Sequence, residues 1–164
     1  NLTASREFVV TCASPTRGVM MGGQNPSNFD TVEYVTISTL GNGTDYGDIS
    51  IATAFGAACS NPIRGLYGGG RTTGDAVNTM YYITIASSGN TVQFGDLTSS
   101  REGLTACSSS IRGVFAGGYS PDSPTVVDTI DYVQIMSLGN AIDFGDLVDD
   151  FTRFTGTSNA HGGL

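Results

Sequence analysis

Apolar residues along the chain come in short runs, and each run ends at a cluster of Gly, Ser, Asn or Pro residues. Between residues 102 and 147 these runs cover about 102–108, 112–119, 128–136 and 141–147. Runs of this length that are rich in Val, Ile, Thr, Tyr and Phe and bounded by turn-forming residues are typical of β-strands. The pattern predicts four short antiparallel strands in this stretch.

The third of these runs has apolar residues on both faces. Successive side chains of a strand point to opposite sides, so Ile130 and Tyr132 share one face and Val133 lies on the other. Residues 32–37 and 80–85 follow the same pattern. A sheet with one wet face would alternate apolar and polar residues, so we expect these strands to lie in sheets covered on both faces.

The chain repeats this four-run pattern three times. Arg17, Arg64 and Arg112 stand in register, 47 and 48 residues apart. The same register aligns a double glycine after the second run, a tyrosine in the third run, a Gly-Asn pair before the fourth and a Gly-Asp pair at its end. The Gly-Asp pairs end at Asp48, Asp96 and Asp146. A period of this length is the signature of a repeat architecture.

Four antiparallel strands per repeat correspond to one blade of a β-propeller, and propellers usually close with about four to eight blades. We therefore predict an all-β fold with blade repeats at 2–48, 49–96 and 97–146, followed by the first strand of a fourth repeat in 147–164. Either more blades lie outside this sequence or copies associate to complete a ring. Both possibilities predict open, sticky blade faces on the isolated chain.

Several residues of the third repeat resemble the kelch family of propellers. Arg101 opens its first strand, the double glycine of "GVFAGG" closes the second, and "VDTIDYVQI" forms a Tyr-bearing third strand. The chain departs from that family in having no Trp near the fourth strand. Aromatic residues stand there instead: Tyr46, Phe94 and Phe144. The resemblance implies a kelch-like propeller in which another aromatic replaces the Trp.

The amino-acid sequences of the repeats show a second resemblance. Stretches such as "RGVFAGGY" at 112–119 and "GNAIDFGDL" at 139–147 resemble repeats of predicted structural and tail-fibre-like proteins of marine cyanobacterial phages. This resemblance covers nearly the whole chain and carries no catalytic motif. It implies a virion component, assembled in the host cytoplasm, whose partners are other virion proteins or copies of itself and a host surface glycan or protein.

Composition and charge limit the classes of binding partner that we expect. The 23 Gly residues, together with many Ser, Thr, Val, Ile and Tyr, favour strands joined by tight turns. A formal charge of -8 with no basic run argues against nucleic acid, because phosphate binding depends on Lys and Arg. No apolar run approaches the roughly 20 residues that span a bilayer, so membrane insertion is not expected.

The residues that recur in every repeat are interpreted as structural. Arg17, Arg64 and Arg112 are expected to bridge neighbouring blades, with the carboxylates of the Gly-Asp pairs as possible partners. Those carboxylates are themselves expected to accept backbone N–H bonds in turns. The alternative is a ring of carboxylates that holds a divalent cation or acts as acids. We favour the structural reading because recognition and catalytic sites are usually asymmetric.

The three cysteines also share one repeat position. Cys12, Cys59 and Cys107 lie 47 and 48 residues apart, and packed blades would hold them about 10 Å from one another, beyond disulfide reach. They are predicted to be small core residues. A reactive thiol or a bond to another chain is the alternative.

Recognition is expected where the repeats differ. The loops between the second and third strands vary in length and content, and their projecting candidates for ligand binding are Arg71, Asp75, Tyr119 and Asp122. His161 is the single histidine, and the chain has no GxSxG, HExxH or Cys/His spacing. No catalytic residue, metal or cofactor is therefore predicted.

These observations lead to one hypothesis and two alternatives. The hypothesis is a non-enzymatic structural and recognition propeller in a phage tail fibre or other virion appendage. One alternative is a glycan-active propeller enzyme of the oxidase or glycosidase kind, which would need an asymmetric set of carboxylates or metal ligands. The other is an intracellular kelch adaptor that binds a protein partner.

Overall fold

The computed structural model describes residues 1–123 and 125–158, and all regular secondary structure in that part of the chain is β-strand. The prediction of an all-β fold is confirmed. The same residues contain no helix long and apolar enough to cross a bilayer.

Three four-stranded antiparallel sheets make up the molecule, and in each the strands pair in chain order. The first sheet contains β1 (Val10–Ala13), β2 (Arg17–Met21), β3 (Thr31–Thr36) and β4 (Thr44–Asp48). The second contains β5 (Ala57–Ser60), β6 (Arg64–Gly68), β7 (Thr79–Thr84) and β8 (Val92–Asp96). The third contains β9 (Thr105–Ser108), β10 (Arg112–Ala116), β13 (Thr129–Gln134) and β14 (Ile142–Asp146). A small hairpin of β11 (Tyr119–Ser120) and β12 (Thr125–Val126) lies between β10 and β13.

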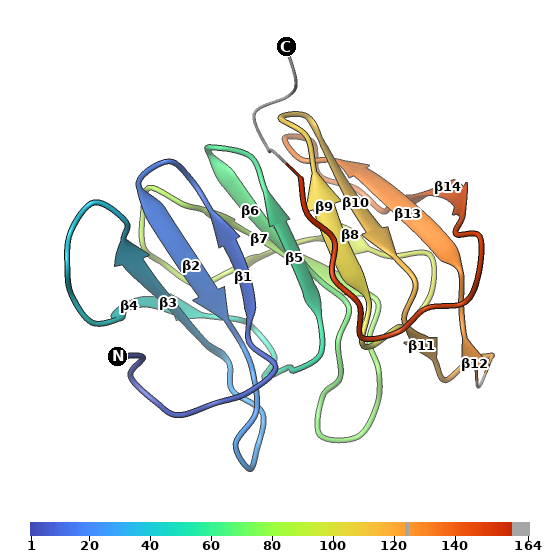
Figure 1. Cartoon of the computed structure of the whole chain (residues 1–164), viewed down its shortest axis with the longest axis horizontal. Helices are drawn as coiled ribbons and strands as arrows, with labels where there is room; N and C mark the ends of the chain where they lie inside the picture. The colour runs from blue at the N-terminus through green and yellow to red at the C-terminus, as the bar shows by residue number, and fades with distance from the viewer. Residues whose placement is uncertain (124, 159–164) are drawn as a thin grey trace.

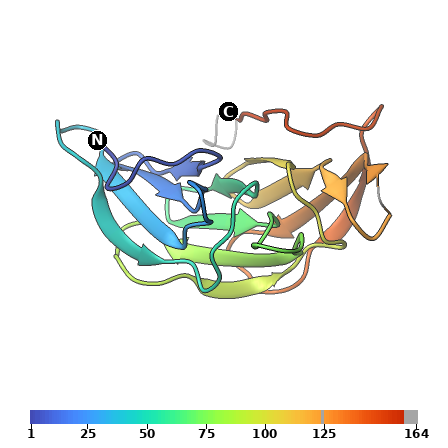
Figure 2. The ribbon, with the colours of Figure 1, turned by 90° about the horizontal axis from the view of Figure 1, so that it is seen from below.

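The sheets follow one another in chain order, with the first strands β1, β5 and β9 as neighbours (Figure 1). The view from below shows the same progression from the first sheet in blue to the third in orange (Figure 2). The strands predicted for the third repeat are all present, each one to three residues shorter at its ends than the apolar run that predicted it. Residues at strand ends pair less completely than those at the centre.

Two apolar cores lie between the sheets. The core between the first and second sheets includes Val19 and Tyr46 from one side and Ile83 and Ile85 from the other. The core between the second and third sheets has the same organisation. The second sheet therefore has apolar side chains on both faces, as its sequence pattern predicted. The outer faces of the first and third sheets have no such neighbour among the described residues.

Hydrogen bonds at the fourth strands explain why the Gly-Asp and Gly-Asn pairs recur in the repeats. The amide of Thr91 donates to the carbonyl of Asp48 at 2.8 Å, and the amide of Asp48 donates to Asn90 Oδ1 at 3.0 Å. The third sheet makes the equivalent bonds to the second, through Ala141 and Asn140 to Asp96. The Gly-Asp pair of one sheet thus contacts the Gly-Asn pair of the next.

A second set of bonds joins the first strands. Ser60 Oγ donates to the carbonyl of Ala13 at 2.7 Å, and Ser108 Oγ donates to the carbonyl of Ser60 at 2.7 Å. The amide of Ser108 in turn donates to Ser158 Oγ at 3.2 Å. Neighbouring sheets are therefore joined by the same polar contacts at each interface.

The structure differs from the sequence prediction after residue 146. We predicted the first strand of a fourth repeat in 147–164, but residues 147–158 contain no strand. This segment lies beside β9, and the amide of Arg153 donates to the carbonyl of Gly103 at 2.7 Å. No second strand in the described chain pairs with it, and a single segment without a ladder partner does not form a strand. His161 lies outside the described residues.

Candidate functional site

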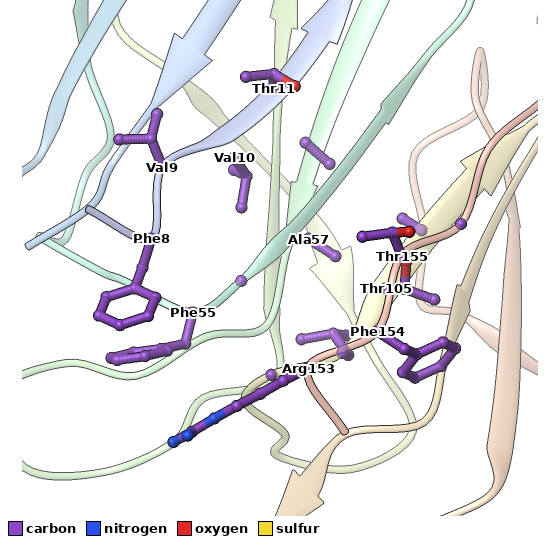
Figure 3. Close-up of a pocket in the computed structure, with 16 residues that line it drawn as sticks. Phe8, Val9, Val10, Thr11, Phe55, Ala57, Thr105, Arg153, Phe154 and Thr155 are labelled. Carbon is purple, nitrogen blue, oxygen red and sulfur yellow. The ribbon is translucent and has the colours of Figure 1, made fainter. Parts of the chain in front are cut away.

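A hollow lies across the first strands of the three sheets. We call it the first-strand groove: it has a volume of about 480 Å³ and is lined by residues 8–11, 55–58, 103–106 and 153–156. These four segments occupy equivalent places in successive repeats. The groove is drawn in Figure 3. Its walls are mostly apolar, with Thr hydroxyls among them.

One backbone conformation recurs at the mouth of this groove. Phe8, Phe55, Gly103 and Arg153 stand at one repeat position, and their φ angles are 56°, 61°, 65° and 57°. This left-handed region is open to glycine but rare for bulky side chains. Only the third repeat places a glycine here, so the same turn is made in the other three places by residues that disfavour it.

The two phenylalanines stack on each other. Their ring centroids are 4.1 Å apart and their planes meet at 31°. Figure 3 shows both rings side by side at the mouth of the groove, with the Arg153 side chain extending toward Phe55. The Arg153 guanidinium lies 5.9 Å from the Phe55 ring centroid, and that of Arg71 lies 4.9 Å from it. Phe8 remains 46% exposed.

A smaller hollow of about 290 Å³ adjoins the groove and is lined in part by Phe55, Glu102, Tyr119 and Arg153. Arg71 lies beside Glu102, with 3.2 Å between Nε and Oε2. Two of the four loop residues proposed as ligand contacts, Arg71 and Tyr119, are thus brought close to the aromatic pair. The other two are exposed in their loops and line neither hollow: Asp75 and Asp122.

The repeated arginines face the next sheet. Arg17 Nη1 donates to the carbonyl of Ile85 at 2.8 Å, and Arg64 Nη1 donates to the carbonyl of Ile135 at 2.9 Å. Each guanidinium also lies over a tyrosine ring of its own sheet, at 4.2 Å from the centroid. Arg112 lies over Tyr132 at 5.1 Å. The hydrogen-bond partners are main-chain carbonyls, not the carboxylates that the sequence suggested.

The repeated aspartates contribute main-chain atoms to the sheet contacts described above. Asp48 and Asp96 bond the next sheet through their amides and carbonyls. Asp146 is the equivalent residue of the third sheet and is exposed. Within residues 1–123 and 125–158, no group of three or more His, Cys, Asp or Glu residues is placed to hold a metal ion.

Two buried ion pairs were not predicted from the sequence. Arg6 Nη2 lies 2.5 Å from Glu33 Oε1, Arg101 Nη2 lies 2.5 Å from Asp131 Oδ2, and all four side chains are fully buried. Arg101 also donates to the carbonyls of Gly117 and Thr129. Burial lowers the pKa of Arg101, and the neighbouring carboxylate opposes that change.

The second repeat has Thr53 and Tyr81 at the two equivalent positions, and neither carries a charge. A signal for the pair is present in two of the three repeats only: Arg6 and Arg101 share one repeat position, and Glu33 and Asp131 share another.

The cysteines are free thiols. Cys12 and Cys59 are buried, and Cys107 is half-buried. Burial raises the pKa of the Cys12 thiol to about 12 and also raises that of Cys59. Both are protonated near neutral pH, and a protonated thiol is a weak nucleophile.

No protein-family model matches this chain, and no curated protein sequence matches it either.

Proposed function

We propose that the chain contributes about three blades to a kelch-like β-propeller, which serves as a non-enzymatic structural and recognition module. In this proposal it belongs to a phage tail fibre or other virion appendage and binds a host surface or a neighbouring virion protein. The repeats that resemble those of phage structural proteins motivate the assignment to a virion. Fold alone does not give function, so the proposal also needs support from the surfaces of the molecule.

The observation that carries the proposal is the contrast between inner and outer sheet faces. Tyr46 and Phe94 are each 3% exposed between sheets, whereas Phe144, at the same repeat position in the third sheet, is 54% exposed. On the opposite end of the molecule Ile37 is 56% exposed, while Ile85 and Ile135 are buried. Apolar positions that are covered at every internal interface are therefore open at both ends.

Such matched open faces favour continuation of the same packing. A further blade could come from more of the same chain or from another copy, and either would cover Phe144 and Ile37 in the way that internal blades are covered. The repeat-invariant residues support a structural role as well. Arg17, Arg64, Asp48 and Asp96 all hold one sheet to the next through main-chain atoms or carbonyl acceptors.

The experiment has two parts. Light scattering of the native particle, with mass spectrometry of the denatured polypeptide, measures how many chains of what mass form the particle. A native mass that is a multiple of the 17.0 kDa chain would indicate assembly between copies, and a heavier polypeptide would indicate further blades. A stable monomer of 17.0 kDa with open faces would contradict ring completion.

Recognition is tested separately by adding fluorescently labelled protein to a panel of marine cyanobacterial cells. Saturable binding that heat-denatured protein does not show is the expected result. No binding to any strain would overturn the recognition role. Release of reducing sugars from the cells would overturn the non-enzymatic assignment.

A further inference from the structure

Each internal interface between sheets contains two close contacts at glycine. A Cβ on Gly65 would lie 2.7 Å from Cys12 Sγ, so the thiol of one sheet fills the space above a glycine of the next. A Cβ on Gly47 would lie 2.6 Å from the carbonyl carbon of Gly89 in the next sheet. The interface between the second and third sheets repeats both contacts. Contacts this close fix the spacing and the register of neighbouring sheets.

The two outer faces carry the separate halves of these contacts. On the third sheet, Cys107 stands at the thiol position and is half-buried, and the described chain places no atom within 4 Å of a Cβ on Gly145. On the first sheet, the described residues place only Val35 Cγ2 near a Cβ on Gly18, at 3.5 Å, and nothing within 4 Å of one on Gly41. One end of the molecule therefore presents the groups that the other end can accept.

A polar contact is divided between the two ends in the same way. Arg64 donates to the carbonyl of Ile135 in the next sheet, whereas its repeat equivalent Arg112 has no such acceptor in the described chain. The first-sheet equivalent of Ile135 is Ile37, which is 56% exposed. A first sheet placed on the third sheet in the internal register would bring the carbonyl of Ile37 to Arg112.

A second copy of the chain is the occupant that covers both ends at once. Each copy has three four-stranded sheets, so two copies supply six blades and three copies supply nine. Propellers usually close with about four to eight blades, and only the pair of copies falls in this range. A ring of two copies has twofold symmetry, which is the commonest symmetry of protein oligomers.

One segment must move when the ring closes. Residues 147–158 lie beside β9, in the place of a following blade's first strand (Figure 1). The amide of Gly118 donates to the carbonyl of Phe151 at 2.8 Å, as the amide of Gly70 donates to the carbonyl of Arg101 one sheet earlier. Residues 2–13 of a second copy, docked in the internal register, would need the same place.

Residues 2–13 are held more firmly than residues 147–158. The first segment contains a strand that pairs with its own sheet, and Arg6 forms a buried ion pair with Glu33. The second segment contains no strand, and Phe151 stands at the repeat position of Arg6. Residues 147–158 therefore have fewer contacts to lose.

We propose that two copies of this chain associate head to tail into a closed six-bladed ring. The third sheet of each copy packs on the first sheet of the other in the internal register, so Cys107 lies on the partner's Gly18. Residues 147–158 leave their place, and residues 2–13 of the other copy fill it. This inference rests on the propeller proposed above and names the partner that completes it.

The test traps this contact with a disulfide between Cys107 and a cysteine introduced by Gly18→Cys. The new side chain fits, since its nearest neighbour in the described chain is Val35 at 3.5 Å. Diamide joins each pair of thiols by accepting their two electrons and two protons. Without oxidant, light scattering should give twice the 17.0 kDa chain mass. After oxidation, the denatured, unreduced protein should also have twice the chain mass, with the introduced cysteine bonded to Cys107.

Two control variants accompany this one. Gly113→Cys places a thiol against Cys59 inside one chain, where a Cβ would lie 2.8 Å from the sulfur. Its oxidation should form an internal disulfide and no covalent dimer. The double variant Gly18→Cys/Cys107→Ser should form no covalent dimer either, because one of the two thiols is gone.

Hydrogen exchange tests which segment moves. The amide of Arg153 donates to the carbonyl of Gly103 at 2.7 Å, so it should exchange faster in the trapped dimer than in the diluted, unlinked chain. Faster exchange in residues 2–13 instead would overturn the release of 147–158.

Three other results would overturn the ring itself. The first is a mass of one chain at every concentration, before and after oxidation. The second is a disulfide between two introduced cysteines, because it requires first sheets to face each other. The third is a ladder of trimers and larger species, because it indicates an open chain of copies. If a monomeric chain still binds cells, the two-copy ring fails while the recognition role stands.

Discussion

The sulfur of Cys12 occupies the space where a side chain on Gly65 would begin. A Cβ on Gly65 would lie 2.7 Å from Cys12 Sγ, and one on Gly113 would lie 2.8 Å from Cys59 Sγ. The first and second sheets each place a thiol against the second strand of the following sheet, at a point where only glycine leaves room. Close packing between sheets therefore explains two repeated features together. The cysteines share one repeat position, and a glycine follows the repeated arginine at the point where the thiol packs.

Gly65→Ala is expected to destabilise the protein by about 1–3 kcal/mol, because the added methyl group overpacks the interface at the thiol. Urea unfolding followed by circular dichroism measures the change. Gly74→Ala is the matched control, since a Cβ there meets no atom within 4 Å. The double variant Cys12→Ala/Gly65→Ala should recover part of the loss. Equal stability of Gly65→Ala and Gly74→Ala would show that the interface is looser than described.

Asp131→Asn should cost about 3–5 kcal/mol, because it leaves the buried guanidinium of Arg101 without its counter-charge. The second repeat offers its own replacement for the pair. The double variant Arg101→Thr/Asp131→Tyr installs the residues found there, Thr53 and Tyr81, and should be more stable than Asp131→Asn. Denaturant midpoints of the three proteins compare them. A double variant less stable than the single one would contradict the equivalence of the two positions.

Alkaline pH should destabilise the protein through its buried thiols. The ordinary pKa of a cysteine is 9.0, and burial raises that of Cys12 to about 12 in the folded state. Above pH 9 the unfolded chain loses these protons while the folded chain keeps them. Stability is therefore full below pH 9 and falls as pH rises toward 12, by up to about 1.4 kcal/mol per pH unit for each thiol.

Urea midpoints measured between pH 8 and pH 10.5 test this expectation. Cys12→Ala lowers the starting stability but should show a shallower decline with pH, because one titrating group is gone. Identical slopes for the parent and the variant would indicate that the decline comes from other groups. Tyr67 is the main competitor, since burial raises its pKa to about 12 as well.

The regular part of the fold could be predicted because each repeat gives the same information again. The spacing of Arg64 and Arg112 fixes where second strands begin, and Tyr82 and Tyr132 mark third strands two residues from equivalent ends. Features that break the repeat were missed. The Arg6–Glu33 pair is hidden because the second repeat has no charge at these places. The strained turn at Phe8 is hidden because glycine appears there only once, at Gly103.

The binding loops show the same limit. Arg71 and Tyr119 were selected for their place in variable loops, and both lie near the groove. Phe8 and Phe55 were not selected, because a phenylalanine next to a strand is usually a core residue. Both stand on a left-handed backbone, with Phe8 46% exposed and Phe55 half-buried, and sequence pattern alone does not indicate this conformation.

Arg64→Ala and Arg112→Ala should differ in effect, although the two residues are repeat equivalents. Arg64 donates to the carbonyl of Ile135 in the next sheet and lies over Tyr82, so its loss should cost about 1–2 kcal/mol. Arg112 has no such carbonyl within the described chain, and its removal should change the unfolding free energy of a monomer by less than about 0.5 kcal/mol.

If another blade covers the third sheet, Arg112 gains an acceptor equivalent to Ile135. Arg112→Ala should then lower the native mass seen by light scattering while Arg64→Ala lowers the unfolding midpoint. Equal losses of stability in both variants, with no change in mass, would contradict this division between internal and open faces.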